Sequence, residues 1–389
     1  MRSLWIILAA GLAAGFVMGQ SVQREGQYWV RSGGSKPAQL SAQVKRVEIF
    51  TRANVTVRGS EDGLVQIKLK QKTRANTVEE ANLLWGPAGQ LAPFVASGGV
   101  MRLELYPLGS ARVITELEIS LPRQLPFVLV NNRSGSVAMY DLDGSVQADS
   151  GGGTLLMDRI RGDVRGNTGF GEIRLGVIGG SAQCSSGGGS ITLENASGGL
   201  NCVTGSGDID VRYAGGVVAV ATEGGNVRVE KAGDAVRARS AAGLIDVVQA
   251  KGPVFADSGG GSIQVGSANG VRAESAAGTI RVKGSSGPVT VSTMFGNIVA
   301  ELLAGGRLAD SSLVSGSGDI TVLIPAGLGL AVRARNDSGV SPRIISDFPE
   351  LQVRSVGFRT PQGQGSINGG GPVLELNTSG GAIYVRRMK

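Results

Sequence analysis

The chain has 389 residues, with 63 glycines, 13 prolines, no histidine and a formal net charge of +7. Glycine is about twice as frequent as its usual ~7%, but collagen's regular spacing is missing, and a hydrophobic content of 41% excludes a flexible polar linker. The missing histidine excludes Ser-His-Asp triads and histidine-bound zinc, and basic residues interspersed with acidic ones, without stacking aromatics, argue against nucleic-acid binding.

The first predicted element is a secretion signal at residues 1–19. Arg2 precedes an apolar run from Leu4 to Val17, and small residues surround a plausible cleavage position after Gly19. The run is shorter than the ~20 residues of a membrane-spanning helix, so a retained anchor is the weaker alternative. We expect an exported chain without a transmembrane span in the mature protein, located in the periplasm, on the cell surface or outside the cell.

Two segments precede the repeats. Residues 20–43 are polar and contain many Gly and Ser residues, which predicts a flexible leader. Residues 44–127 contain short apolar strands without a fixed period, together with a helix start at Thr77 and Glu80, which have capping-box spacing. We interpret residues 44–127 as a β-rich N-terminal cap.

The central segment, residues 128–322, repeats in steps of 18 residues up to Gly261 and with small departures after it. Each unit holds two short strands whose side chains alternate inward and outward. The turns are too short for hairpins in this register, so equivalent strands should stack in parallel about 4.8 Å apart. The predicted fold is all-β: a parallel, β-helix-like solenoid of 18-residue, two-strand coils, followed by degenerate coils and a cap at 323–389. An anchor glycine recurs at positions 135, 153, 171, 189, 207, 225, 243, 261, 278, 296 and 318.

A hydroxyl residue stands three positions before each anchor glycine from Gly153 onward. Alternation points these side chains inward, where a buried hydroxyl must find a partner. We expect a structural ladder in which the hydroxyls bond to each other and to turn N–H groups; a row of serine nucleophiles is rejected because no histidine could activate it. The ladder residues are Ser150, Thr168, Ser186, Thr204, Thr222, Ser240, Ser258, Ser275 and Thr293.

The two cysteines, Cys184 and Cys202, are 18 positions apart in one inward column. They should face each other on adjacent coils. Export permits a disulfide, but in-register parallel strands hold the Cβ atoms slightly too far apart for one. Stacked core thiols are therefore the favoured prediction, and a disulfide is the alternative.

No catalytic, cofactor-binding or metal-binding residue is predicted, and no cofactor is expected. Calcium-binding β-rolls need Asp in every nonapeptide, whereas most units here have Ser, Thr or Asn in place of Asp208. Asp208 with Asp210, or Asp257 with Glu274, could supply the two carboxyl groups of a glycosidase, which lie about 5–10 Å apart. Ion pairing on the surface is the favoured interpretation of these acids.

Several features occur in a fixed order: a Leu121-Pro122 step, serial Ser/Thr-x-x-Gly-x-Ile-x-Val units, Ser-Asp-Phe-Pro at 346–349, a Gly-rich stretch at 365–371 and a final repeat. Together they resemble a bacterial family of β-strand-repeat envelope proteins regarded as candidate adhesins, a domain of unknown function. The resemblance covers about residues 44–389 and implies a solenoid in the cell envelope, with no catalytic residues to transfer.

The leading hypothesis is a non-enzymatic adhesive or structural protein whose extended flat face binds an envelope or surface polymer, either a glycan or a protein. The alternative is a carbohydrate-active β-helix enzyme with paired carboxylates in a cleft bounded by residues 302–312 or 341–372. A scaffold partner in the envelope is a third hypothesis.

Overall fold

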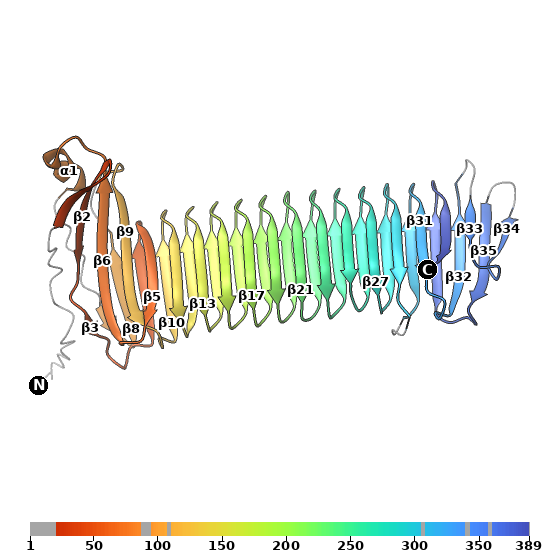
Figure 1. Cartoon of the computed structure of the whole chain (residues 1–389), viewed down its shortest axis with the longest axis horizontal. Helices are drawn as coiled ribbons and strands as arrows, with labels where there is room; N and C mark the ends of the chain where they lie inside the picture. Colours follow the sequence, from red (N-terminus) through yellow and green to blue (C-terminus); the bar gives the residue numbers. More distant parts are fainter. Residues whose placement is uncertain are drawn as a thin grey trace, which may run out of the picture. The chain divides into compact units, whose positions relative to one another are not determined.

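The computed structural model of the chain describes residues 21–86, 95–106, 110–304, 308–338, 343–356 and 360–388. The predicted signal segment, residues 1–19, lies outside them. Within the described residues the fold is all-β and solenoid-like, with two long sheets of mainly parallel strands and one helix, α1 (Val78–Trp85) (Figure 1). The chain divides into two compact units, Met1–Gly188 and Gly189–Lys389, which are described in turn.

The strands of the first unit belong to two sheets. Sheet 1 contains β1 (Ser21–Glu25), β2 (Tyr28–Gly34), β3 (Ala38–Gln39), β5 (Asn54–Ser60), β6 (Leu64–Thr73), β9 (Ile114–Pro122), β11 (Val137–Leu142), β13 (Leu155–Ile160) and β15 (Ile173–Ile178). Sheet 2 contains β4 (Arg46–Thr51), β7 (Val95–Ser97), β8 (Val100–Leu105), β10 (Phe127–Asn132), β12 (Ser145–Ser150), β14 (Val164–Thr168) and β16 (Ala182–Ser186).

The first strands of the chain do not stack in sequence order. In sheet 2, β4 lies between β8 and β10, and in sheet 1, β5 lies between β9 and β11; all four pairings are parallel. The strands of residues 44–127 therefore join the same two sheets as the repeats, although their sequence lacks the period. Their order depends on pairing between distant segments, which a periodic pattern does not record.

The prediction of a flexible leader at residues 20–43 is wrong. This segment contains β1, β2 and β3, and β2 pairs antiparallel with β6 from Trp29 opposite Thr73 to Gly34 opposite Lys68. Val30 is fully buried in this pairing. The Gly and Ser residues suggested a flexible segment. Backbone hydrogen bonds to β6 and buried side chains such as Val30 nevertheless hold β2 in the sheet.

The helix predicted to start at Thr77 is confirmed as α1, which continues to Trp85 and covers a buried arginine that no sequence pattern indicated. The Thr77 hydroxyl caps the helix by accepting the Glu80 N–H (3.2 Å). Arg31 is 5% exposed; it donates to Gln71 Oε1 (2.6 Å) and to the Gly86 carbonyl (3.2 Å), and it lies over the Trp85 ring. Burial lowers the pKa of this guanidinium.

The second unit continues the same pattern. Its sheet 1 strands are β17 (Ile191–Ala196), β19 (Ile209–Ala214), β21 (Val227–Ala232), β23 (Ile245–Ala250), β25 (Ile263–Ser267), β27 (Ile280–Ser285), β29 (Ile298–Leu302), β31 (Ile320–Ile324), β33 (Ile344–Ser346) and β37 (Ile383–Arg387). Its sheet 2 strands are β18 (Leu200–Thr204), β20 (Val218–Thr222), β22 (Val236–Ser240), β24 (Val254–Ser258), β26 (Val271–Ser275), β28 (Val289–Thr293), β30 (Ser311–Ser315), β32 (Leu330–Asn336), β34 (Gln352–Val356), β35 (Thr360–Ile367) and β36 (Val373–Thr378).

Strand pairing in the second unit follows the sequence register. Val218 pairs with Val236, Val236 with Val254 and Val254 with Val271, all in parallel. Inward residues of both sheets, such as Ala238 and Ile263, are almost completely buried. The inward apolar side chains are valine and alanine in β20 to β26 of sheet 2 and mainly isoleucine and valine in the sheet 1 strands, so the packing repeats from strand to strand.

The C-terminal strands are inserted out of order. β36 pairs in parallel with both β30 and β32, and β37 pairs in parallel with both β31 and β33. Two antiparallel strands, β35 and then β34, follow β32 in sheet 2. The Asp347 carboxylate accepts from Arg386 (2.7 Å) and from the Arg387 N–H (3.1 Å), and these contacts hold its pKa below the ordinary value.

The hydroxyl column makes two kinds of hydrogen bond to backbone turns. Thr222 Oγ1 donates to the Gly207 carbonyl (2.9 Å) and accepts the N–H of Gly225 (3.1 Å). Ser240 repeats this with Gly225 and Gly243, both at 2.9 Å. The turn N–H partners match the expectation from the sequence. For these two hydroxyls the other partner is the carbonyl of the preceding anchor glycine, in place of the neighbouring hydroxyl expected from the sequence.

Both cysteines are buried, Cys184 at 3% and Cys202 at 0% exposure, and each is disulfide-bonded. No free cysteine occurs in the part of the chain that the structure describes. The two cysteines are therefore oxidised, which was the alternative to the favoured prediction of core thiols. The prediction rested on an average Cβ separation that exceeds the disulfide range only slightly, so small departures from it reverse the outcome.

Candidate binding surface

The acidic residues considered as catalytic pairs lie in two different settings. Asp208 accepts the backbone N–H of Asn226 (2.7 Å) and so supports a turn, while Asp210 is exposed on β19 in sheet 1. Asp257 and Glu274 do come together, because they are directly opposite on β24 and β26 and both point outward from sheet 2.

Asp257 and Glu274 are not arranged like the acids of a glycosidase. Asp257 lies 3.9 Å from Arg239 and Glu274 lies 2.9 Å from Arg272, and the two acidic side chains are 63% and 50% exposed. A glycosidase keeps one acid protonated by surrounding it with apolar groups, and neither acid has such surroundings. Residues 341–372 were the second segment expected to border a catalytic cleft. The described residues that line a hollow near this segment contribute one carboxylate, Glu375.

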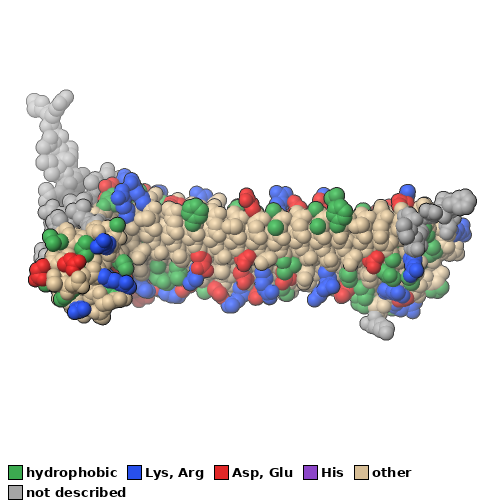
Figure 2. Space-filling model, turned by 90° about the horizontal axis from the view of Figure 1, so that it is seen from above, with side chains coloured by type: hydrophobic (Ala, Val, Ile, Leu, Met, Phe, Trp, Pro, Cys, Tyr) green, Lys and Arg blue, Asp and Glu red, His purple; other side chains and the backbone are tan. Residues whose placement is uncertain are grey.

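Figure 2 shows basic and acidic side chains interspersed along the drawn face, with uncharged side chains and backbone between them. Among the described residues no cluster of three or more acidic or cysteine side chains is placed to hold a metal ion. In the same residues, no helix has the length and hydropathy needed to cross a membrane.

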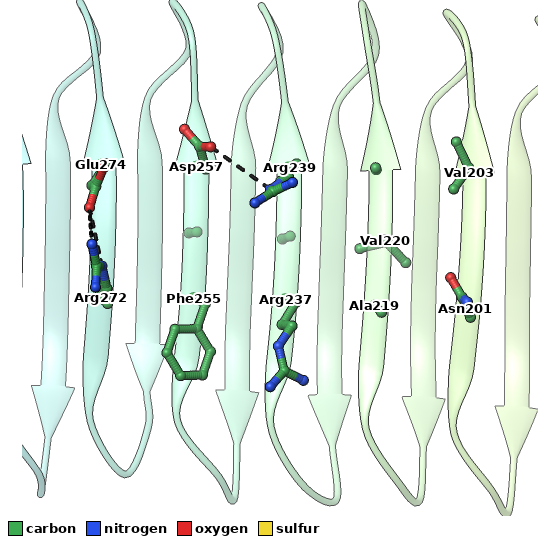
Figure 3. Close-up of a pocket in the computed structure, with 13 residues that line it drawn as sticks. Asn201, Val203, Ala219, Val220, Arg237, Arg239, Phe255, Asp257, Arg272 and Glu274 are labelled. Atoms are coloured by element: carbon green, nitrogen blue, oxygen red, sulfur yellow. Dashed lines mark hydrogen bonds and ion pairs between the residues drawn. The ribbon is translucent and has the colours of Figure 1, made fainter.

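The outward face of sheet 2 in the second unit is hollowed across β18 to β26 (Figure 3). Outward residues in adjacent strands stand directly opposite one another, which aligns them in two rows across the strands. The first row is Asn201, Ala219, Arg237, Phe255 and Arg272, and the second row is Val203, Ala221, Arg239, Asp257 and Glu274.

The hollow exists because β20 carries two alanines where its neighbours carry longer side chains. Ala219 and Ala221 form a low floor, with Arg237 and Arg239 rising on the next strand. We call this hollow the alanine trough; its volume is about 550 Å³. β18 and β22, the strands on either side of β20, are two strand spacings apart, about 10 Å. This distance leaves room for an extended polymer chain or a sugar ring.

Charged and aromatic groups border the alanine trough. The Arg237 guanidinium lies 5.4 Å from the centroid of the Phe255 ring, which is 39% exposed. Arg239 and Arg272 each have a carboxylate partner, but no ion pair forms between Arg237 and an acid of the described residues. A guanidinium held against a ring remains available to a ligand oxygen.

Comparisons with known proteins give weak similarities. No family model matches the chain, and no curated protein matches it. A solved candidate cell adhesion protein from Clostridium sporogenes is 10% identical, with 92% of this chain and 100% of that chain covered and a TM-score of 0.19. A candidate adhesin from Bacteroides fragilis is 12% identical, with 92% and 97% covered and a TM-score of 0.19.

A candidate lipid-binding protein from Parabacteroides distasonis is also similar, at 12% identity, with 75% of this chain and 96% of that chain covered and a TM-score of 0.29. At this level of identity and structural overlap, the comparisons do not assign a function.

Proposed function

We propose that this chain is a non-enzymatic binding protein of the bacterial envelope that contacts a surface polymer through the outward face of sheet 2. The observation that carries the proposal is the alanine trough, an open hollow with an apolar floor and guanidinium groups along its side. Such a surface suits an extended partner lying across many strands better than a small substrate enclosed in a pocket.

The proposed architecture is a parallel solenoid of two-strand, 18-residue coils at residues 128–322, with 44–127 and 323–389 as its ends. The equal spacing of paired residues in sheet 2, such as Val218, Val236 and Val254, supports this unit. Export directed by residues 1–19 would place the chain in the periplasm, on the cell surface or outside the cell.

A glycan array of bacterial surface polysaccharides, probed with labelled full-length protein, tests this function. We expect binding to at least one polysaccharide without its hydrolysis. Ala221→Trp should weaken that binding about tenfold or more, because the indole fills the floor of the alanine trough. The matched control is Thr321→Trp, which adds the same ring to an outward position of β31 in sheet 1.

The proposal fails if Ala221→Trp and Thr321→Trp bind equally well, or if no polysaccharide on the array is bound. Release of shorter sugars from any bound polysaccharide would support the enzyme hypothesis instead.

A further inference from the structure

A second hollow occurs on sheet 2 near the C-terminal end, where eight outward side chains form a regular grid. Its volume is about 570 Å³, and it spans β36, β32, β35 and β34, in that spatial order. The first row across the strands is Glu375, Arg333, Gln364 and Gln352, and the second row is Asn377, Arg335, Gln362 and Arg354. We call these eight residues the arginine–amide grid.

The arginine–amide grid depends on the inserted C-terminal strands. β36 reaches its place beside β32 only because the chain returns after β34 and β35 to fill the position between β30 and β32. Glu375 and Asn377 therefore complete a surface whose other six side chains come from earlier segments. Side chains on paired strands are held in fixed register, so the spacing of the groups is set by the sheet.

The charge of the grid is only partly neutralised. Three guanidinium groups face one carboxylate, and Arg333 and Glu375 are 4.0 Å apart, the limit of an ion pair. Arg335 contacts Asp337 outside the grid at 2.9 Å. Arg354 donates to the Gln352 amide (3.1 Å) and forms no ion pair with an acid of the described residues. The grid thus retains positive charge for a ligand.

The side-chain types indicate the ligand. Guanidinium groups bind carboxylates through paired hydrogen bonds, and four carboxamides both donate and accept, as sugar hydroxyls require of a partner. The eight side chains include no aromatic ring to stack a nucleic-acid base and no apolar anchor of the kind that dominates protein interfaces. Arg335 and Arg354 flank Gln362 at a separation of about two strand spacings, or ~10 Å.

From this grid we infer an anion-binding site for an acidic polysaccharide whose uronate carboxylates meet the guanidinium groups while its hydroxyls meet the carboxamides. The inference rests on the grid residues alone. It concerns strands distinct from those of the alanine trough, so it stands or falls separately from the function proposed above.

Titration of the full-length protein with polygalacturonate tests the inference, with the fully methyl-esterified polymer as the uncharged control ligand. We expect the binding of polygalacturonate to weaken as salt is added. The methyl ester should bind at least about tenfold more weakly than polygalacturonate. The double variant Arg335→Gln, Arg354→Gln should bind polygalacturonate about tenfold more weakly. Arg281→Gln with Lys283→Gln removes the same charge from β27 in sheet 1 and should change the affinity less than about twofold.

Three results would overturn the site. One is equal loss of affinity in the two double variants, which would indicate a general charge effect. Another is equal binding of the ester, or of sodium polyphosphate, which offers charge without hydroxyls. The third is loss of polygalacturonate binding in Ala221→Trp, which would move the ligand to the alanine trough. Circular dichroism of each variant confirms that these exposed changes leave the sheets intact.

Discussion

Replacing Gly261 with alanine is expected to lower the free energy of unfolding by about 3 kcal/mol or more, whereas Gly260→Ala should change it by less than about 0.5 kcal/mol. The two glycines are neighbours in one turn. A Cβ on Gly261 would overlap the backbone carbonyl of Gly243, the preceding anchor, while a Cβ on Gly260 meets nothing closer than the Ala241 carbonyl oxygen at 4.0 Å.

The expected difference follows from the stacking of anchor glycines. Gly243 itself lies against the Gly225 carbonyl, so no strand in this stack can move aside without disturbing the next one. Urea unfolding of both variants, followed by circular dichroism, measures the effect. Equal stabilities of Gly260→Ala and Gly261→Ala would show that the turns are not in close backbone contact.

Thr222→Val is expected to lower the free energy of unfolding by about 2–4 kcal/mol. The substitution keeps the shape of the side chain but removes both hydrogen bonds of the hydroxyl. The Gly207 carbonyl and the Gly225 N–H, both buried, then lose a partner. Each such group costs about 1–3 kcal/mol when left unsatisfied.

Thr222→Ser is the matched control, because it keeps the hydroxyl and removes one methyl group, at a cost of about 1 kcal/mol. Chemical unfolding should therefore place serine between threonine and valine in stability. If valine proves as stable as serine, the hydroxyl column contributes packing only, and its hydrogen bonds do not stabilise the turns.

The strands of the repeats were predictable because pairing there depends on neighbouring segments alone. Once Val218, Val236 and Val254 share a position in the period, parallel stacking brings them together. The same reasoning does not reach the chain ends. β36 and β32 have a similar alternation of inward and outward residues, so the sequence does not tell which of them pairs with β30. Contacts between distant segments place β36 between β30 and β32.

Side chains outside the period were harder to anticipate. The buried Arg31 is held by Gln71 and by the end of α1, a combination that no local pattern indicates. The alanine trough was accessible in principle, since reading the outward positions at repeat spacing places Ala219 between Asn201 and Arg237. The arginine–amide grid was not, because it requires the antiparallel strands β34 and β35 and the inserted β36.

The central proposal, that an 18-residue two-strand coil is the repeating unit, is tested most directly by deletion. Removing residues 226–243 joins Gly225 to Leu244 and deletes one whole unit, so every remaining strand keeps a partner in register. Removing residues 226–234 deletes β21 alone, so that two sheet 2 strands, β20 and β22, follow one another directly and the alternation of the two strand types is broken. We expect the first deletion variant to unfold cooperatively within about 5 °C of the full chain, while the second loses the cooperative transition. Equal behaviour of the two deletions, or an unfolded protein from the first, would contradict it.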